Sequence, residues 1–179
     1  WVIMLATNAI EYACGVWGST YLVEEKNFEI GHGALALTIY YVGMSLGRFL
    51  SGLLANKIKT WKRIFIGSVI LAPAIVIMLL PLPNVFAVLG LFLIGLGNGS
   101  IYPNMIHLTP HNFGKEVSQS IMGSQIAFAY MGVMLAPPMV SLISGLFGIK
   151  VYPVLLALLY VVMVITIKCF TNRLKKQGR

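Results

Sequence analysis

Six long apolar stretches alternate with short polar gaps along the chain. Most of the stretches reach the ~20 residues that a helix needs to cross the ~30 Å hydrocarbon layer of a membrane. A helix also satisfies its own backbone hydrogen bonds, as lipid requires. We therefore predict an all-α membrane protein whose transmembrane helices lie at about residues 1–23, 33–56, 64–80, 85–109, 117–147 and 151–170.

Basic residues collect in alternate gaps between these stretches. One cluster follows the second stretch and consists of Lys57, Lys59, Lys62 and Arg63. Lys115 follows the fourth stretch, and a basic tail, 171–179, follows the sixth. Because cationic loops stay in the cytoplasm, we predict that both termini are cytoplasmic, in a plasma membrane of bacterial type.

The composition agrees with a bundle in lipid. Hydrophobic residues make up 58% of the chain and charged residues 10%, which is typical of a lipid-facing bundle. The net charge of +8 is explained by basic clusters that set topology and contact anionic lipid, so we predict no nucleic-acid partner. The gaps are too short for a further domain, so residues 1–179 form one unit. Its first and last three helices are expected to form a 3+3 repeat.

Two charged residues lie inside the predicted spans, Glu11 and Arg48. Contact with lipid would cost either of them several kcal/mol, so each must face a wet cavity or a polar partner. At ~100° per residue, Asn8, Glu11 and Tyr12 share one side of the first helix. That side is typical of a solute-lined wall, and its carboxyl group can take up and release a proton. The alternative is a structural carboxylate that is tied to a neighbouring helix.

The fourth span offers an opposing wall. Asn98 and Tyr102 lie one turn apart in a glycine-rich segment, and Pro103 is expected to bend the helix there. Bent helices often line substrate sites, although a packing kink explains the segment equally well. In the same span Gly95 and Gly99 lie four residues apart, a spacing that lets helices approach closely and that we interpret as packing.

Other chemistry is not supported by the sequence. His107 and His111 have a spacing that can bind metal on a helix, but Pro110 intervenes and no zinc-peptidase carboxylate follows. No phosphate-binding loop or nucleophile motif occurs. We therefore predict no metal, no cofactor and no enzymatic activity.

The segment GRFLSGLLANKIKTWKR, residues 47–63, resembles the major facilitator superfamily signature between helices 2 and 3, or 8 and 9. Gly52 and Lys57 match that signature, whereas Asn56 replaces its acid. The resemblance implies that Gly52 packs closely against the fifth helix or its pseudo-symmetric mate. It also implies a cytoplasmic gate formed by Arg48, Gly52, Asn56, Lys57 and Arg63.

Four patterns together look similar to the second half of fucose permease-like sugar:proton symporters: the first helix around Glu11, the Gly47-Arg48 pair, the segment 97–103, and Gly132 with Pro137. The resemblance spans almost the whole chain. It implies one six-helix half of a major facilitator superfamily fold, with the first and fourth helices central, the second and fifth rocking, and the third and sixth supporting. The start at Trp1 rather than Met favours the carboxy-terminal half of a twelve-helix protein.

The implied function is transport of a small polar solute such as a sugar by alternating access, coupled to protons through Glu11. The partners are then the solute, protons, the lipid bilayer and the other six-helix half, in the same chain or as a second subunit. The predicted substrate-binding residues are Asn8, Glu11, Tyr12, Trp17, Asn98, Tyr102, Gln125 and Phe128. Two alternatives remain open. One is a non-transporting membrane subunit or sensor, which the missing acid favours, and the other is a half-size chain that works as a dimer.

Overall fold

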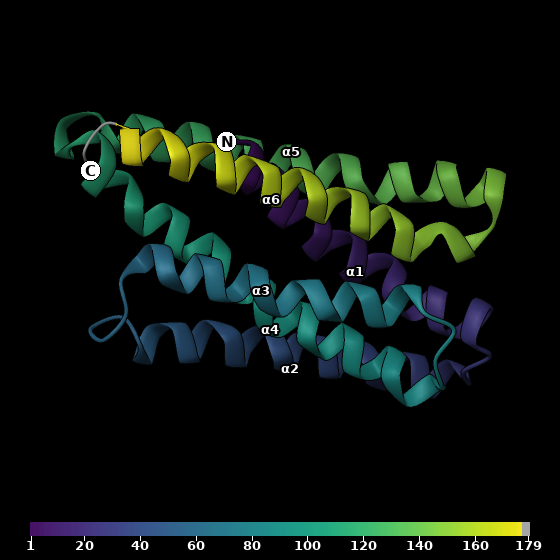
Figure 1. The fold of residues 1–179 in the computed structure, drawn as a ribbon. Helices are drawn as coiled ribbons and strands as arrows, with labels where there is room; N and C mark the ends of the chain where they lie inside the picture. Colours follow the sequence, from purple (N-terminus) through teal and green to yellow (C-terminus); the bar gives the residue numbers. More distant parts are fainter. Residues whose placement is uncertain (177–179) are drawn as a thin grey trace.

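The chain folds into an elongated bundle of helices (Figure 1). The computed structural model describes residues 1–176, so 177–179 of the predicted basic tail lie outside the described residues. A short 3₁₀ turn, Ile149–Val151, precedes the last helix. The described residues form six α-helices: α1 (Val2–Lys26), α2 (Ile30–Leu53), α3 (Thr60–Leu79), α4 (Asn84–Phe113), α5 (Lys115–Phe147) and α6 (Tyr152–Lys176).

Several helices extend past the predicted apolar stretches. Hydrophobicity marks only the part of a helix that lies in the hydrocarbon layer, and the helix can continue beyond it. α1 ends at Lys26, because the left-handed φ of 54° at Asn27 stops the helix. α4 and α5 are separated by Gly114 alone, with φ 84°. The second helix, in contrast, ends at Leu53 rather than at residue 56. Asn56 and Lys57 therefore lie in the turn after α2.

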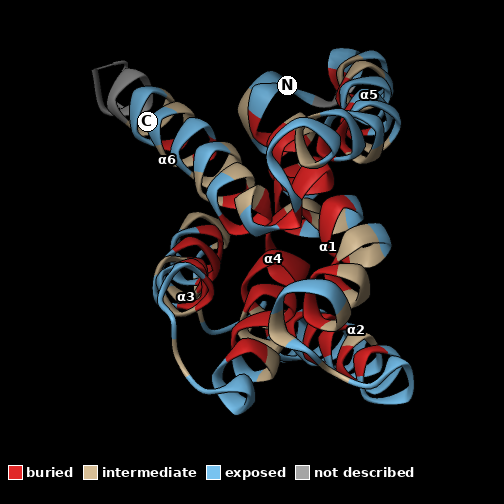
Figure 2. Cartoon of the chain, turned by 90° about the vertical axis from the view of Figure 1, so that its right-hand side faces the viewer, coloured by how far each residue is buried: buried red, intermediate tan, exposed pale blue. Residues whose placement is uncertain are grey.

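Five of the described helices, α2 to α6, are long and apolar enough to cross a membrane. α1 is not among them, because polar and charged residues interrupt its apolar sequence. α1 and α4 nevertheless carry the longest runs of buried residues, at 6–10 and 97–101. Figure 2 shows this buried centre, with α3 and α6 on one side and α2 and α5 on the other.

The helices pack as two groups of three. α4 packs mainly against α2 and α3, and we call these three helices the α4 group. α1 packs mainly against α5 and α6, and we call these the α1 group. α2 and α3 barely contact each other, and neither do α5 and α6. Each central helix therefore carries two helices that lie on it side by side without packing together.

Glycines bring α2 and α4 into backbone contact. A methyl group at Gly43 or Gly47 would collide with a carbonyl oxygen of α4, and one at Gly95 or Gly99 with a carbonyl oxygen of α2. The predicted small-residue packing is thus confirmed at this crossing. In the α1 group, Gly132 of α5 makes the comparable contact, against the carbonyl oxygen of Leu5.

Candidate functional site

The two charges inside the bundle form an ion pair. Arg48 Nη2 of α2 donates to Glu11 Oε1 of α1 at 3.3 Å. The Glu11 side chain is 18% exposed and that of Arg48 is 50% exposed, so the pair lies at the edge of the buried centre. Tyr40 strengthens the same α1–α2 contact, because its hydroxyl donates to the backbone oxygen of Glu11 at 3.3 Å. Each charge thus has the polar partner that its position requires.

Tyrosines surround this pair. The hydroxyl of Tyr41 lies against Gly15 of α1, where an added methyl carbon would be 2.5 Å away. Tyr12 and Glu11 are within electrostatic reach of Tyr41. Tyr102 of α4 is within electrostatic reach of Glu11, Arg48 and Tyr130 of α5. We define the site cluster as Glu11, Tyr12, Tyr41, Arg48, Tyr102 and Tyr130.

The site cluster draws its residues from α1, α2, α4 and α5. Tyr12, Tyr41 and Tyr130 are exposed, and Tyr102 is half-buried. α3 and α6 contribute nothing to it and lie on the opposite side of the bundle (Figure 2). The three exposed tyrosines mark a side of the cluster that the described helices leave uncovered, and we call it the open side.

Three predicted solute ligands are buried instead and bond to protein. Asn8 is 9% exposed and donates to the Met4 carbonyl of its own helix at 2.9 Å. Asn98 is 1% exposed and donates to the Thr7 carbonyl of α1 at 3.0 Å. Gln125 is 6% exposed and accepts from the Thr109 hydroxyl at 2.8 Å. The last two bonds tie helices together, so these amides already bond to protein groups, and their binding of solute stays a prediction.

Gln125 belongs to a buried stripe of α5. The stripe repeats every three or four residues and comprises Gln125, Ala129, Gly132, Ala136 and Val140. That spacing keeps side chains on one helix face, and this face packs on α1 and α4. The contact of Gln125 with α4 is therefore enough to explain why a glutamine occurs in this apolar sequence.

The two predicted apolar contacts also lie off the open side. Trp17 is about 140° around α1 from Tyr12, since five residues separate them. It donates from Nε1 to the Pro137 carbonyl of α5 at 3.1 Å. Phe128 is 37% exposed but lies two residues, or about 160°, from Tyr130 on α5. Tyr130 and Phe128 thus lie on different sides of α5, and Phe128 as a solute contact stays a prediction.

The predicted gate residues have different surroundings. Arg63 is only 7% exposed and donates from Nη1 to the Ser51 carbonyl at the end of α2, at 2.8 Å. Asn104 of α4 donates to the Ser51 hydroxyl at 2.7 Å, which joins α2, α3 and α4 in one polar junction. Gly52 is exposed, and a methyl group there would meet nothing within 4 Å. The close packing expected of Gly52 is thus not made within this chain.

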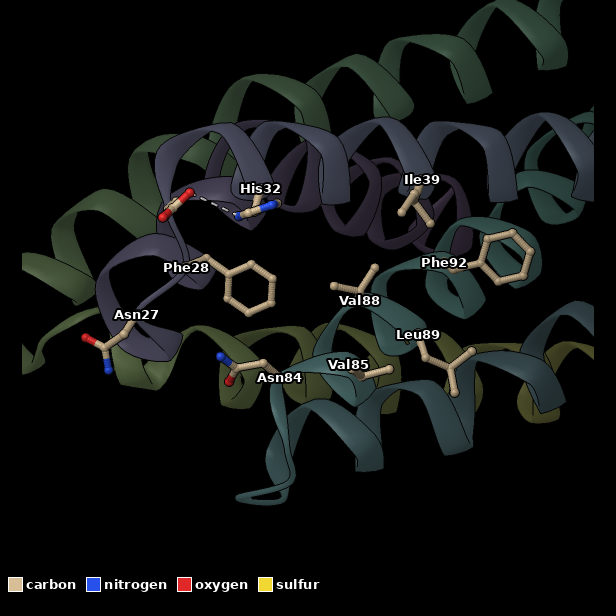
Figure 3. A pocket seen from close by; sticks show the side chains of 10 residues that line it. Asn27, Phe28, His32, Ile39, Asn84, Val85, Val88, Leu89 and Phe92 are labelled. Carbon is tan, nitrogen blue, oxygen red and sulfur yellow. Dashed lines mark ion pairs between the residues drawn. The ribbon is translucent and has the colours of Figure 1, made fainter.

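A separate groove lies where α2 and α4 diverge from their glycine contact. Its volume is about 700 Å³, and Phe28 projects into it between the two helices (Figure 3). Glu29 and His32 pair at 3.4 Å on its rim, and both are exposed. The remaining wall is mostly apolar, so the groove lacks the convergent polar groups that fix a polar solute.

Sequence reasoning missed Tyr41 and Tyr130. Tyr41 precedes Arg48 by seven residues, which places both on one face of α2. The spacing could have predicted Tyr41 as a site residue, because an aromatic residue two turns from a charged residue in the same span lies on the same helix face. Tyr130 has no such signal in α5, because only its neighbour Tyr102, from α4, marks it as part of the cluster.

Known proteins resemble this chain over most of its length. The model of the Major Facilitator Superfamily matches residues 1–179. An uncharacterized MFS-type transporter of Yersinia pestis is 21% identical over 141 residues, which cover 75% of this chain. The same alignment covers 35% of that protein, so the chain spans about a third of the length of the relative it matches.

Proposed function

The chain belongs to the Major Facilitator Superfamily, and from that premise we propose that it is the carboxy-terminal half of a twelve-helix secondary transporter. With five helices apolar enough to span a membrane, it is an integral membrane protein. The transported solute is small and polar, such as a sugar, and its movement is coupled to protons. The observation that carries the proposal is the Glu11–Arg48 pair on the open side of the bundle.

The helix packing supports a 3+3 repeat. Exchanging α1 with α4, α2 with α5 and α3 with α6 converts the main contacts of one group into those of the other. Such internal symmetry is common in transporters. It assigns central places to α1 and α4, and the open side of α1, α2, α4 and α5 is then the surface that meets the other half. Solute binds between the halves and is exposed to one side of the membrane at a time.

The chemistry of the site cluster suits a sugar. Tyrosine rings offer flat apolar faces with a polar tip, and the hydroxyls of Tyr12, Tyr41, Tyr102 and Tyr130 donate and accept hydrogen bonds. The Glu11 carboxylate accepts hydrogen bonds from sugar hydroxyls. The described residues of the cluster carry no charge besides the Glu11–Arg48 pair, so the cluster suits a neutral solute.

Proton coupling follows from the ion pair. When Glu11 accepts a proton, it loses its charge and its attraction for Arg48, which loosens α1 from α2. A solute hydroxyl then competes for the neutral carboxyl group. Release of the proton restores the pair, so that proton occupancy and solute occupancy act on the same contact between two helices.

The basic end of the bundle is proposed to face the cytoplasm. Lys57, Lys59 and Lys62 follow α2, while Glu24, Glu25 and Glu29 lie at the opposite end. Positive loops are retained inside.

Uptake by the purified full-length protein in vesicles tests this function. Labelled monosaccharides are offered with and without an inward proton gradient. We expect gradient-driven accumulation in the native protein. In Glu11→Gln we expect accumulation to fall steeply while exchange of labelled for unlabelled sugar persists. A Glu11→Gln protein that keeps full gradient-driven uptake rules out the coupling role, and the absence of uptake for every monosaccharide rules out the sugar assignment.

A further inference from the structure

A narrow crevice separates α2 from α3. Both helices lie on α4 but barely contact each other, and the space between them measures about 130 Å³. Leu96 and Ser100 of α4 form its floor, and Leu50 of α2 and Ile66 of α3 stand at its walls. Leu50 and Ile66 are both exposed. The crevice therefore opens outward, and its wall is almost entirely apolar.

A buried arginine closes the basic end of this crevice. Arg63 lines it and is only 7% exposed. Its Nη1 donates to the Ser51 carbonyl at 2.8 Å and its Nη2 to the Thr60 hydroxyl at 3.0 Å. Its Nε has no acceptor among the described protein atoms. A buried donor without an acceptor is unfavourable, and more so when it is charged.

In the described part of the chain, Arg63 has no carboxylate partner. Among the described residues it forms no ion pair, since the pairs there join Glu11 with Arg48 and Glu29 with His32. Lys57, Lys59 and Lys62 are exposed close to it in sequence and add positive charge. The donor that lacks an acceptor thus lies where an apolar crevice meets a basic loop.

We propose that this crevice binds an anionic phospholipid. The head-group phosphate accepts from Arg63 Nε and attracts the loop lysines, while the start of an acyl chain enters the crevice between α2 and α3. Basic pockets between helices on the cytoplasmic side bind such head groups. A free phosphate would leave the apolar walls unfilled, and a zwitterionic lipid would leave the excess positive charge unmatched.

The α1 group contains a matching crevice without a cation. It lies between α5 and α6 on α1, measures about 310 Å³ and is lined by apolar residues and a glycine, among them Leu135, Met139 and Leu158. Acyl chains can occupy it, but nothing there selects a head group. The α5–α6 crevice is therefore the internal control for head-group selection.

Native mass spectrometry of the purified full-length protein tests the proposal. The protein is titrated with phosphatidylglycerol or with phosphatidylcholine, and the apparent dissociation constant of the first bound lipid is measured. We expect tighter binding of phosphatidylglycerol, and a loss of about fivefold in Arg63→Gln, the amount that one cation contributes near a membrane surface.

Ile66→Trp keeps Arg63 and blocks the crevice, so it decides the outcome if Arg63→Gln does not fold. It should weaken phosphatidylglycerol binding to a similar extent, whereas Leu158→Trp in the α5–α6 crevice should not. Equal affinity for the two lipids in the native protein overturns the proposal, as does unchanged phosphatidylglycerol binding in Ile66→Trp. The readout is lipid binding, so the result does not depend on transport activity.

Discussion

In the α4 group, α2 and α4 cross through four glycines whose Cα atoms face backbone carbonyls, and Arg63 and Asn104 join the ends of three helices through Ser51. In the α1 group, Gly132 makes the comparable close contact, and a larger apolar crevice separates the outer helices. The same arrangement of helices is thus held tightly in one group and more loosely in the other.

This difference indicates which contacts hold the bundle rigid and which contacts can change during transport. Backbone contact at glycines fixes the distance between α2 and α4, because no side chain there can rearrange. The contacts between the groups are fewer, and they include specific polar bonds such as those from Asn98 to Thr7 and from Arg48 to Glu11. Polar contacts can break and form again. They therefore allow the α1 group and the α4 group to shift relative to each other when solute binds. Four predictions test this comparison.

The largest effect is expected at the glycine crossing. Gly95→Leu places a side chain against the Tyr40 carbonyl and forces α2 away from α4. Overpacking typically costs about 1–3 kcal/mol, and contact with backbone is the least adjustable case, so we expect about 3 kcal/mol or failure to fold. Thermal unfolding in detergent measures it. Gly145→Leu in α5 is the matched control, since nothing lies within 4 Å of that site. Equal stability of the two variants would contradict a tight crossing.

The ion pair between the groups comes next. Because Arg48 is half exposed, the pair itself should contribute only about 1 kcal/mol to stability. Glu11→Gln and Arg48→Gln should each lower gradient-driven uptake about tenfold, whereas their effects on unfolding stay small. The double variant should be no worse than either single one, because both remove the same contact. Additive losses in uptake would show that the two residues act separately.

The sequence could predict much of the fold because membrane helices must be apolar over a fixed length. Six α-helices occur in the described part of the chain, five of them apolar enough to span a membrane. α1 is not apolar enough to be counted among the spanning helices, because Glu11 and its polar neighbours reduce its hydropathy. These are the residues around which the site lies. Family membership, expected from the motif around Gly52 and Lys57, is confirmed by the match over residues 1–179.

The site was less accessible to sequence reasoning. Glu11 and Arg48 could be recognised singly, because a charge in lipid is costly, but their pairing depends on how α1 crosses α2. The polar character of Asn98 and Gln125 predicts solute contacts, yet Asn98 donates to a backbone carbonyl of α1 and Gln125 accepts from the Thr109 hydroxyl of α4. A sequence shows which residues need a polar partner and does not show whether that partner is a helix or a ligand.

The polar ties should differ between the groups. Asn104 lies within the α4 group and donates at 2.7 Å to Ser51 Oγ and at 2.6 Å to the Ser100 carbonyl. Asn98 ties α4 to α1 through one bond, and its Oδ1 has no partner among the described atoms. Asn104→Ala should cost about 2 kcal/mol and Asn98→Ala about 1 kcal/mol. Thermal unfolding of both variants measures which substitution destabilises more. A larger loss of stability in Asn98→Ala would show that the bond between the groups is stronger than the bonds within the α4 group.

The smallest effect is expected on α5, where the open side and the opposite side of one helix can be compared. Tyr130→Phe removes a single hydroxyl from the site cluster. If that hydroxyl bonds the solute, the half-saturating sugar concentration should rise about threefold, within the range of one neutral hydrogen bond, with no change in thermal unfolding. Phe128→Leu, about 160° away on the same helix, is the control and should leave uptake unchanged. The opposite result, with Phe128→Leu impaired and Tyr130→Phe normal, would contradict the prediction. It would show that solute contacts the Phe128 side of α5 and not the Tyr130 side.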